Sequence, residues 1–460
     1  MFHHSKRLIN ITIAVLVFAL LSGFIAAPAA SAKPNAPKNI IVMISDGWGF
    51  NHIQSTSYYV YGKAGRQAYN HFPIKFAMST YENYYDTSPC YGLGYDPNLS
   101  WSDFDYVKSC VTDSASAATA MSTGVKTYNG AIGVDMNQQP LLHAMQVAEV
   151  KGKSTGVVTS VQFSHATPAG FVAHNISRNN YAEIANEMIY VSATDVIMGA
   201  GHPWYDDSGN PIVVPNTFKY VGGETTWADL VNGSAGNDAD GDSDFDAWTL
   251  IQTRQEFQNL ATGSTPERVV GVAQVYSTMQ QSRLGDGYAD PFVIPLTESV
   301  PTLEEMTRAA LNILDNDPQG LFLMVEGGAV DWASHANQSG RMIEEQIDFD
   351  KAVQAVIKWV KKNSNWGETL LIVTGDHETG YLNGPGSDPT WEPIVNNGKA
   401  ILPGMAWYSG NHTNSLIPFF SIGFKAQWFK QYANLIDPVR GAYMDNTNIA
   451  QVIFQLLESQ

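Results

Sequence analysis

The chain has 460 residues, 44% hydrophobic and 15% charged, a balance typical of a large folded protein with a buried core. Its formal net charge of -18 argues against a protein that wraps nucleic acid, because phosphate backbones are bound by basic faces. An anionic substrate would therefore need local positive charge, which bound metal ions and a few arginines could supply.

Residues 1–32 have the pattern of an export signal. Lys6 and Arg7 precede an apolar stretch from Leu8 to about Ala27, and an A-x-A-like cleavage site ends at Ala32. The alternative is an uncleaved membrane anchor, because the apolar stretch is long for a signal. We expect cleavage and an exported protein, periplasmic or secreted, without membrane contact afterwards. No later segment is apolar for long enough to span a bilayer.

Residues 33–460 alternate between strand and helix patterns. Short apolar runs predict strands, apolar residues at helical spacing predict helices, and Thr302 with Glu305 forms a capping box. This order predicts one large α/β domain, a three-layer α/β/α sandwich around a mostly parallel sheet. We expect strands over 38–45, 154–161, 321–325, 369–374 and 417–423, and helices over 139–152, 302–314, 341–362 and 446–457.

Residues 203–300 are rich in Gly, Asn and Asp, and we interpret this stretch as a surface insertion on the core domain. It contains a loop with aspartates at alternate positions, which can surround Ca²⁺ with oxygen ligands. The EF-hand pattern is not met, because no glutamate stands at its last position, and a solvated acidic turn is an equal alternative. The candidate Ca²⁺ ligands are Asp238, Asp240, Asp242 and Asp244.

The two cysteines, Cys90 and Cys110, favour a disulfide if the protein is exported, because that compartment is oxidising. The bridge would close a loop just upstream of Ser114 and contribute about 3 kcal/mol by restricting the unfolded chain. The alternative is two free, buried thiols.

Three strand-like runs end on acidic residues, and open α/β sheets build their sites at the carboxyl ends of such strands. The first ends at Asp46, the second at Glu326, and the third at the adjacent pair Asp376 and His377. Carboxylates and imidazoles are the ligands that divalent metals take. Each acid by itself could also be a turn former.

Asp331 and His335 are four residues apart, so a helix would project both toward one metal; the alternatives are a helix cap and a surface histidine. His412 is a loop histidine, and such residues are more often solvated than metal-bound. Asp113 and Ser114 open a run of small residues that should be helical, where the helix N-terminus favours an alkoxide. Ser114 could instead be only an N-cap, and no Gly-x-Ser-x-Gly elbow indicates an esterase triad.

Taken together, these residues stand in the order found in the alkaline phosphatase family, which the chain resembles over almost all of its length after residue 32. Several motifs in one order are a specific signal. The match rests on Ile44–Gly49, Asp113–Ala115, Ala166–Ala169, Ser177–Arg178, Val325–Gly327, Asp331 with His335, Gly375–Gly380 and His412–Thr413.

The resemblance implies an alkaline phosphatase-like fold, two Zn²⁺, one Mg²⁺ and a homodimer. It implies that Ser114 is the nucleophile, that Arg178 clamps two phosphate oxygens, and that Asp113 helps to hold this arginine. The implied ligands are Asp331, His335 and His412 for the first zinc, Asp46, Asp376 and His377 for the second, and Glu326, Thr167 and the bridging Asp46 for Mg²⁺.

The activity that follows is hydrolysis of small-molecule phosphate monoesters through a phosphoserine, with a broad substrate range and an alkaline pH optimum. Two zincs about 4 Å apart suit the attacking and leaving oxygens on opposite sides of one phosphorus. The alternatives are a phosphodiesterase or sulfatase of the same superfamily and an exported metal-binding surface protein. The last would leave Ser114 and Arg178 without a role.

The chain departs from the best-known bacterial periplasmic members at two positions. Those members have an aspartate two residues before the Mg-site threonine and a lysine directly after the first-zinc aspartate; here these positions are His165 and Trp332. His165 resembles the animal enzymes, and the His/Trp pair resembles some marine and cold-adapted bacterial members. We expect both side chains to lie beside the substrate, and the loss of the lysine to weaken the binding of phosphate. The alternative for Trp332 is that it only packs beside the site.

Overall fold

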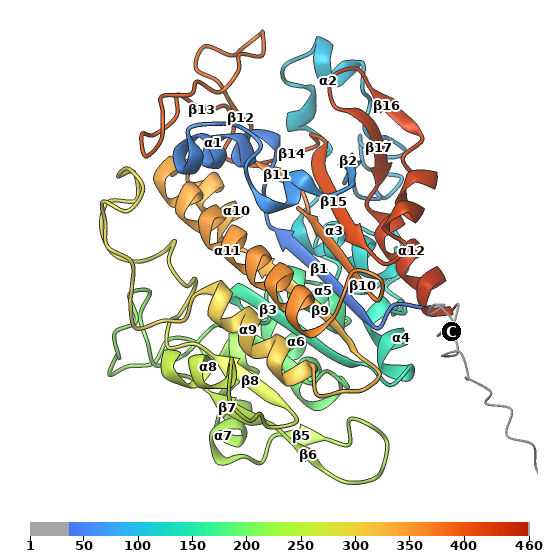
Figure 1. Cartoon of the computed structure of the whole chain (residues 1–460), viewed down its shortest axis with the longest axis vertical. Coiled ribbons are helices and arrows are strands. Elements are labelled where there is room, and N and C mark those ends of the chain that lie inside the picture. Colours follow the sequence, from blue (N-terminus) through green and yellow to red (C-terminus); the bar gives the residue numbers. More distant parts are fainter. Residues whose placement is uncertain (1–35, 459–460) are drawn as a thin grey trace, which may run out of the picture. The chain divides into compact units, whose positions relative to one another are not determined.

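The computed structural model describes residues 36–458, so the predicted export signal lies outside the described part of the chain. An 11-stranded sheet forms its centre (Figure 1). In spatial order its strands are β16 (Leu435–Asp437), β17 (Gly441–Asp445), β2 (Ile74–Ser79), β15 (Ile417–Gly423), β10 (Thr369–Thr374), β1 (Asn39–Ser45), β9 (Leu321–Gly327), β3 (Ser154–Gln162), β4 (Val196–Ala200), β8 (Val269–Val272) and β7 (Thr249–Ile251).

Neighbouring strands from β10 to β7 are all parallel. β15 runs antiparallel to both β10 and β2, and β16 runs antiparallel to β17. In the middle of the sheet, β1 pairs with β9 on one side and β10 on the other. The carboxyl ends of these three strands, which are far apart in sequence, therefore meet at one edge.

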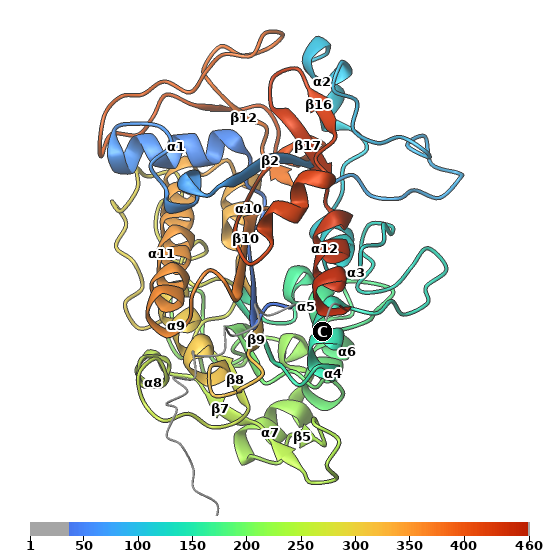
Figure 2. The same ribbon diagram turned by 45° about the vertical axis from the view of Figure 1, so that its right-hand side comes forward.

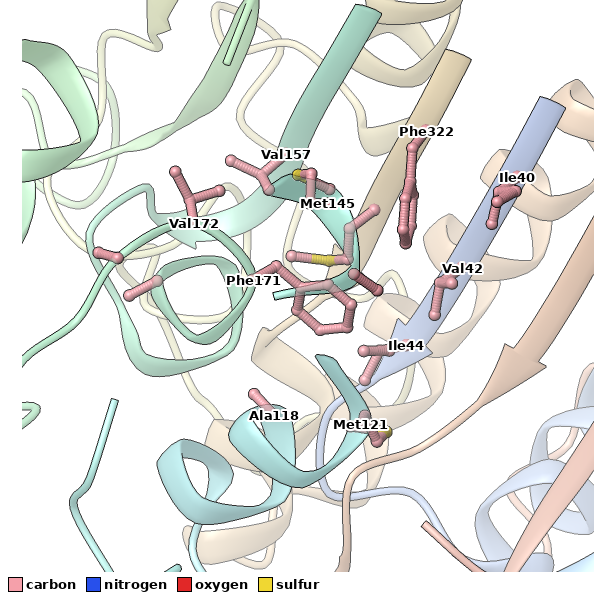
Figure 3. Close-up of a cluster of buried hydrophobic side chains, with 14 of the residues drawn as sticks. Ile40, Val42, Ile44, Ala118, Met121, Met145, Val157, Phe171, Val172 and Phe322 are labelled. Atoms are coloured by element: carbon pink, nitrogen blue, oxygen red, sulfur yellow. The ribbon is translucent and has the colours of Figure 1, made fainter. Parts of the chain in front are cut away.

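Helices cover both faces of the sheet, as Figure 2 shows from the side. On β1, Ile40, Val42 and Ile44 pack into one core (Figure 3). Ile41 and Met43 pack into the other. The first face carries α3 (Ser114–Thr123), α4 (Ala144–Val150), α5 (Ala166–Val172), α6 (Tyr181–Tyr190), α7 (Glu224–Asn232) and α12 (Thr447–Glu458). The second carries α1 (Phe50–Tyr61), α8 (Arg254–Leu260), α9 (Leu303–Leu314), α10 (Ala329–His335) and α11 (Ser339–Asn363).

This arrangement confirms the predicted three-layer α/β/α architecture. All seven residues of β1 are buried, as expected for a parallel strand covered on both faces. Burying each large aliphatic side chain contributes about 1.5–3 kcal/mol, so the two cores hold the central strands firmly in register. No helix among residues 36–458 combines the length and the apolar character needed to cross a membrane.

The predicted strands and the helices α9, α11 and α12 lie within a few residues of their expected bounds. The helix expected over 139–152 is wrong at its start, because α4 begins only at Ala144. Pro140 instead pairs with Val134 across a tight turn, and a residue before proline is disfavoured in a helix. The remaining short elements are α2 (Leu99–Ser102), β5 (Gly236–Asn237), β6 (Asp246–Ala247), β11 (Glu378–Thr379), β12 (Leu382–Asn383), β13 (Ala406–Trp407), β14 (His412–Thr413) and the 3₁₀ turns at 68–71, 106–108, 219–221 and 426–431.

Residues 203–300 are tied to the core sheet. They contribute β7 and β8 to its edge, and α7 and α8 to its two faces. The remainder consists of loops and the short hairpin of β5 and β6. Their interpretation as an insertion, and the division at residue 32, stay predictions.

Asp350, on α11, gives a prediction about stability. Its side chain is buried and accepts hydrogen bonds from Tyr69 Oη at 2.9 Å and Gln346 Nε2 at 3.0 Å. Burial raises the pKa of Asp350 to about 7, so its neutral form stabilises the fold. That contribution is complete below the ordinary pKa of about 4 and is lost as the pH rises through about 7.

Asp350→Asn should therefore remain neutral and lose less stability than the parent protein between pH 5 and pH 8. We expect a difference on the order of a few kcal/mol at pH 8, measured by denaturant unfolding at both pH values. Asp103→Asn, an exposed control, should show no such difference. An identical pH dependence in the parent and Asp350→Asn would contradict the prediction.

Candidate active site

The carboxyl edge of the central strands brings together the first cluster of candidate ligands. Asp46 directly follows β1, and Asp376 and His377 follow β10. His377 Nε2 lies 3.2 Å from Asp376 Oδ2 and 3.6 Å from Asp46 Oδ1. All three side chains are fully buried.

Several oxygens in this cluster lack a hydrogen-bond partner among the described residues. They are both carboxylate oxygens of Asp46 and Oδ2 of Asp376, and all three are buried. Burial, together with neighbouring carboxylates, raises the pKa of Asp46, and it raises the pKa of Asp376 to about 7. Burying charged groups without partners is costly, so a metal ion with oxygen and imidazole ligands fits this donor set.

The second cluster lies against the first. His335 Nε2 is 3.0 Å from His412 Nε2 and 3.4 Å from Asp331 Oδ2, and His412 Nε2 is 3.6 Å from Asp331 Oδ1. Asp331 and His335 are one turn apart on α10, as their spacing predicted. Ligand atoms of Asp331, His412 and His377 also lie within 4.8 Å of one another, so His377 borders both clusters.

The backbone orients these imidazoles. Nδ1 of His335 lies 2.7 Å from the Gly410 carbonyl, and Nδ1 of His412 lies 2.8 Å from the Thr112 carbonyl. A proton on each Nδ1 satisfies these carbonyls and leaves the lone pair of each Nε2 directed into the cluster. This is the tautomer that a metal ligand requires.

Gly47 allows the two clusters to approach each other. Its φ of +74° favours glycine, and a Cβ there would lie 2.7 Å from Cα of Asp331. The backbone N–H of Gly47 also donates to Asp376 Oδ1 at 3.0 Å. A side chain at this position would force Asp46 and Asp331 apart.

A third group of oxygens lies around Glu326 in β9. Oε1 of Glu326 and Oγ1 of Thr167 are buried without hydrogen-bond partners among the described residues, while Thr159 Oγ1 donates to Glu326 Oε2. Burial raises the pKa of Glu326 to about 7, although the hydrogen bond from Thr159 opposes the shift. Oxygen-only ligands of this kind suit Mg²⁺.

Ser114 is the first residue of α3 and is 2% exposed. Asp113 caps this helix by accepting from the backbone N–H of Ser116 at 3.0 Å, so the reading of Ser114 as the N-cap is wrong. Ser114 Oγ lies 3.2 Å from His377 Nε2. The hydroxyl therefore lies at the positive end of a helix and beside the first ligand cluster.

Arg178 lines the same cleft as Ser114, and its Nη1 donates to Asp113 Oδ2 at 2.8 Å. Burial by itself would raise the pKa of Asp113, but the Arg178 charge and backbone hydrogen bonds lower it below its ordinary value. The pair is thus ionised, and the guanidinium keeps other donors available for an anion. Around it the cleft, of about 720 Å³, is lined by Lys108, Val111, His165, Gln281, Ser282, Asp331, Trp332, His335, Asn411 and His412.

The structure brings His165 and Trp332 together at this cleft, with ring centroids 5.8 Å apart.

Sequence reasoning missed the residues that support the ligands. Thr379 donates to Asp331 Oδ1 and lies 3.3 Å from His377 Nδ1, and Thr159 bonds Glu326. The available signal was that Thr379 lies within the motif at 375–380.

The predicted disulfide between Cys90 and Cys110 is confirmed. Cys110 lies two residues before Thr112, whose carbonyl orients His412. Replacing both cysteines by serine should lower the free energy of unfolding by about 3 kcal/mol. It should also weaken metal retention at the second cluster, which contains His412. Thermal unfolding and metal loss to a chelator would measure the two effects. Unchanged metal retention in a destabilised variant would contradict the predicted effect on metal binding.

The acidic loop gathers a set of residues that differs from the one expected. Ligand atoms of Asp238, Asp240 and Asp246 lie within 4.8 Å of one another, so Asp246 takes the place of Asp242 and Asp244. Asp242 instead accepts from the backbone N–H of Asp244 at 2.8 Å. Calcium binding at this loop stays a prediction.

Comparison with known proteins identifies the family of the chain. A family model described as alkaline phosphatase matches residues 37–416. The chain belongs to the alkaline phosphatase family. Membership makes it a phosphoric monoester hydrolase, and the two ligand clusters and the serine lie at the sheet edge that its central strands share.

Curated alkaline phosphatases are similar over most of their length. Alkaline phosphatase H of Pseudomonas aeruginosa (strain UCBPP-PA14) is 32% identical over 365 residues, which are 75% of this chain and 70% of that protein. Alkaline phosphatase of Escherichia coli (strain K12) is 30% identical, with 75% and 71% covered. Alkaline phosphatase 4 of Bacillus subtilis (strain 168) is 30% identical, with 79% and 66% covered.

Solved structures agree with this assignment. The alkaline phosphatase from the Antarctic bacterium TAB5 is 27% identical, with a TM-score of 0.61 over 92% of this chain and 99% of that chain. The Thermus thermophilus alkaline phosphatase is 21% identical, with a TM-score of 0.62 and 96% of both chains covered, and it supports the fold alone.

Proposed function

We propose that this alkaline phosphatase family member hydrolyses phosphate monoesters to an alcohol and inorganic phosphate through a phosphoserine on Ser114. The observation that carries the proposal is the position of Ser114 Oγ. It lies at the start of α3, 3.2 Å from His377 Nε2, in a cleft that Arg178 also lines. The attacking oxygen of Ser114 and the anion-binding guanidinium of Arg178 thus line the same cleft.

We assign two Zn²⁺ and one Mg²⁺ to the ligand clusters, because their unpaired buried oxygens and converging imidazole nitrogens fit such cations. When bound, these ions would favour the serine alkoxide, neutralise the leaving oxygen and activate a water molecule. A variant of the TAB5 enzyme, 25% identical with a TM-score of 0.59, was solved with Mg bound in its M3 site, which supports the third assignment. The assigned ligands are Asp331, His335 and His412, then Asp46, Asp376 and His377, and for Mg²⁺ Asp46, Thr167 and Glu326.

Two displacements at phosphorus complete the reaction. In the first, Ser114 Oγ forms a bond to phosphorus while the bond to the alcohol oxygen breaks on the opposite side. In the second, water attacks phosphorus, the bond to Oγ breaks and inorganic phosphate leaves. Arg178 meets the charge on the equatorial oxygens in both steps, and Asp113 keeps its side chain in place.

We propose a broad range of monoesters and an alkaline pH optimum, because every named contact is to the phosphoryl group. His165 and Trp332 would border that group from the same cleft. With Trp332 in place of a lysine the site holds less positive charge, so bound phosphate should be released more readily. Product release can limit turnover in such enzymes.

Relative rates on three aryl esters test the reaction class. We expect the phosphate monoester to react at least about a hundredfold faster than the phosphodiester or the sulfate, since Arg178 and the helix N-terminus suit a dianion. Assays at pH 7 and pH 9 with one leaving group would show the preference. Faster diester or sulfate hydrolysis would favour the corresponding superfamily alternative.

The remaining proposals concern the setting of the enzyme. Residues 1–32 support export to the periplasm or the medium, and the family resemblance supports a homodimer. Sedimentation of the purified enzyme would measure the oligomeric state, and the N-terminal sequence of the exported protein would locate the cleavage site.

A further inference from the structure

The turn formed by Asn129 and Gly130 contacts both parts of the site that handle the phosphoryl group. We propose that Asn129 is a positioning residue which, with Gly130, fixes Ser114 relative to Arg178. The inference rests on the proposed function, because it assumes that these two residues act on one phosphoryl group. Neither turn residue contributes to the ligand clusters described above.

The amide of Asn129 spans the residues around Ser114. Its Oδ1 accepts the backbone N–H of Asp113 at 2.6 Å and the hydroxyl of Ser116 at 3.3 Å. Its Nδ2 donates to the carbonyl of Val111 at 3.2 Å. One planar side chain therefore ties down the chain on both sides of the nucleophile.

Gly130 connects this segment to the arginine. Its backbone N–H lies 3.1 Å from each carboxylate oxygen of Asp113, and its carbonyl accepts the backbone N–H of Arg178 at 2.7 Å. Asp113 in turn holds Arg178 Nη1. The φ of Gly130 is +88°, and a Cβ there would meet no atom within 4 Å, so conformation and not space requires glycine.

The rest of the molecule holds the turn from two directions. On one side, Lys126 Nζ donates to the Tyr81 carbonyl at 2.6 Å. On the other, Ile132 and Asn175 exchange backbone hydrogen bonds of 2.9 and 2.8 Å. The turn is thus fixed to the chain just after β2 and to the segment that leads to Arg178.

Preorganisation explains why a fixed Asn129–Gly130 turn matters for the reaction. An arginine that is free to change rotamer loses conformational entropy when it binds phosphate, and a nucleophile shifted by about 1 Å can lose about a hundredfold in rate. The Asn129–Gly130 turn sets both positions before substrate arrives. Its contribution should therefore depend on the presence of the Arg178 side chain.

A double-mutant cycle tests this dependence. The variants are Asn129→Ala, Arg178→Ala and the double variant, each loaded with Zn²⁺ and Mg²⁺ and checked for metal content. The measurements are the dissociation constant of inorganic phosphate and kcat and KM for an aryl phosphate. We expect Asn129→Ala to weaken phosphate binding and to lower kcat/KM by about tenfold to a hundredfold in the parent. In the Arg178→Ala background the loss of phosphate affinity should be several-fold smaller.

Asn137→Ala is the matched control. Asn137 lies on the same connection between α3 and α4, and its own backbone N–H and carbonyl make its hydrogen bonds with Asp135 and Gln139. This variant should leave every constant unchanged. If Asn129→Ala does not fold, Asn129→Ser replaces it in the same cycle. Equal losses of phosphate affinity in both backgrounds, or a lower melting temperature with unchanged constants, would overturn the inference.

Failure of the inference is distinguishable from failure of the proposed function. An inactive Ser114→Ala variant with an additive cycle would leave the phosphoserine mechanism standing and remove only the role of Asn129. An active Ser114→Ala variant would remove the mechanism itself, whatever the cycle shows.

Discussion

Replacing Ser114 by alanine should abolish turnover while metal content stays at the level of the parent enzyme. Ser114 Oγ lies beside His377, but the ligand clusters are complete without it. Loss of a nucleophile removes the covalent route entirely, so we expect kcat to fall by at least about a thousandfold. The measurement is steady-state hydrolysis of an aryl phosphate together with elemental analysis of the same sample.

Ser109→Ala is the control for this experiment. Ser109 precedes the same helix, and its hydroxyl donates to the carbonyl of Tyr106 and lies outside the site, so its loss should not change kcat. Substantial activity in Ser114→Ala, with full metal content, would rule out a phosphoserine on this residue. Trapping radiolabelled phosphate on the parent but not on Ser114→Ala would support it directly.

Removing the metals should have the second large effect, on both activity and stability. Asp46, Asp376 and Glu326 are buried, and burial raises the pKa of each, because removal from water disfavours the charged carboxylate. Cations that bind only the folded chain stabilise it, by about 2.7 kcal/mol at a free concentration of one hundred times Kd. We expect prolonged chelation to abolish turnover and to lower the melting temperature by several degrees.

Calorimetry and activity on the same chelated sample would show whether both changes occur together. Restoring Zn²⁺ and Mg²⁺ should recover both, whereas restoring Ca²⁺ alone should not recover activity, since imidazole ligands suit zinc. Asp46→Asn provides a matched variant, because it keeps the shape of a residue assigned to two metals and removes its charge. A metal-free preparation with full activity would contradict the assignment.

The sequence places several candidate ligands at recognisable strand ends or on one helix, and the structure brings these residues together. Their roles as metal ligands stay predictions. Asp46, Glu326 and Asp376 lie at or just after the ends of short apolar runs that predict buried strands, and such strands place their carboxyl ends together. Asp331 and His335 share a helical spacing. The convergence of these residues therefore follows from local patterns and one topological rule.

Other parts of the site depend on contacts between segments and leave no local pattern. Thr159 and Thr379 hold carboxylates that lie far away in the chain, and threonine is common in strands. Asn129 acts through a side-chain amide in a loop, where asparagine is frequent for conformational reasons. The helix predicted over 139–152 was wrong at its start for the same reason. The apolar spacing extended back to residue 139, whereas Pro140 pairs with Val134 and α4 begins at Ala144.

The order of the central strands has a consequence for biosynthesis. β1 emerges early in synthesis, yet its neighbours β9 and β10 come from the last third of the chain, and His412 follows them. A growing polypeptide therefore carries Asp46 for most of its elongation with neither sheet partner present. Metal uptake should accordingly be among the last events of maturation, and partially made chains would be unable to compete with the finished enzyme for scarce ions.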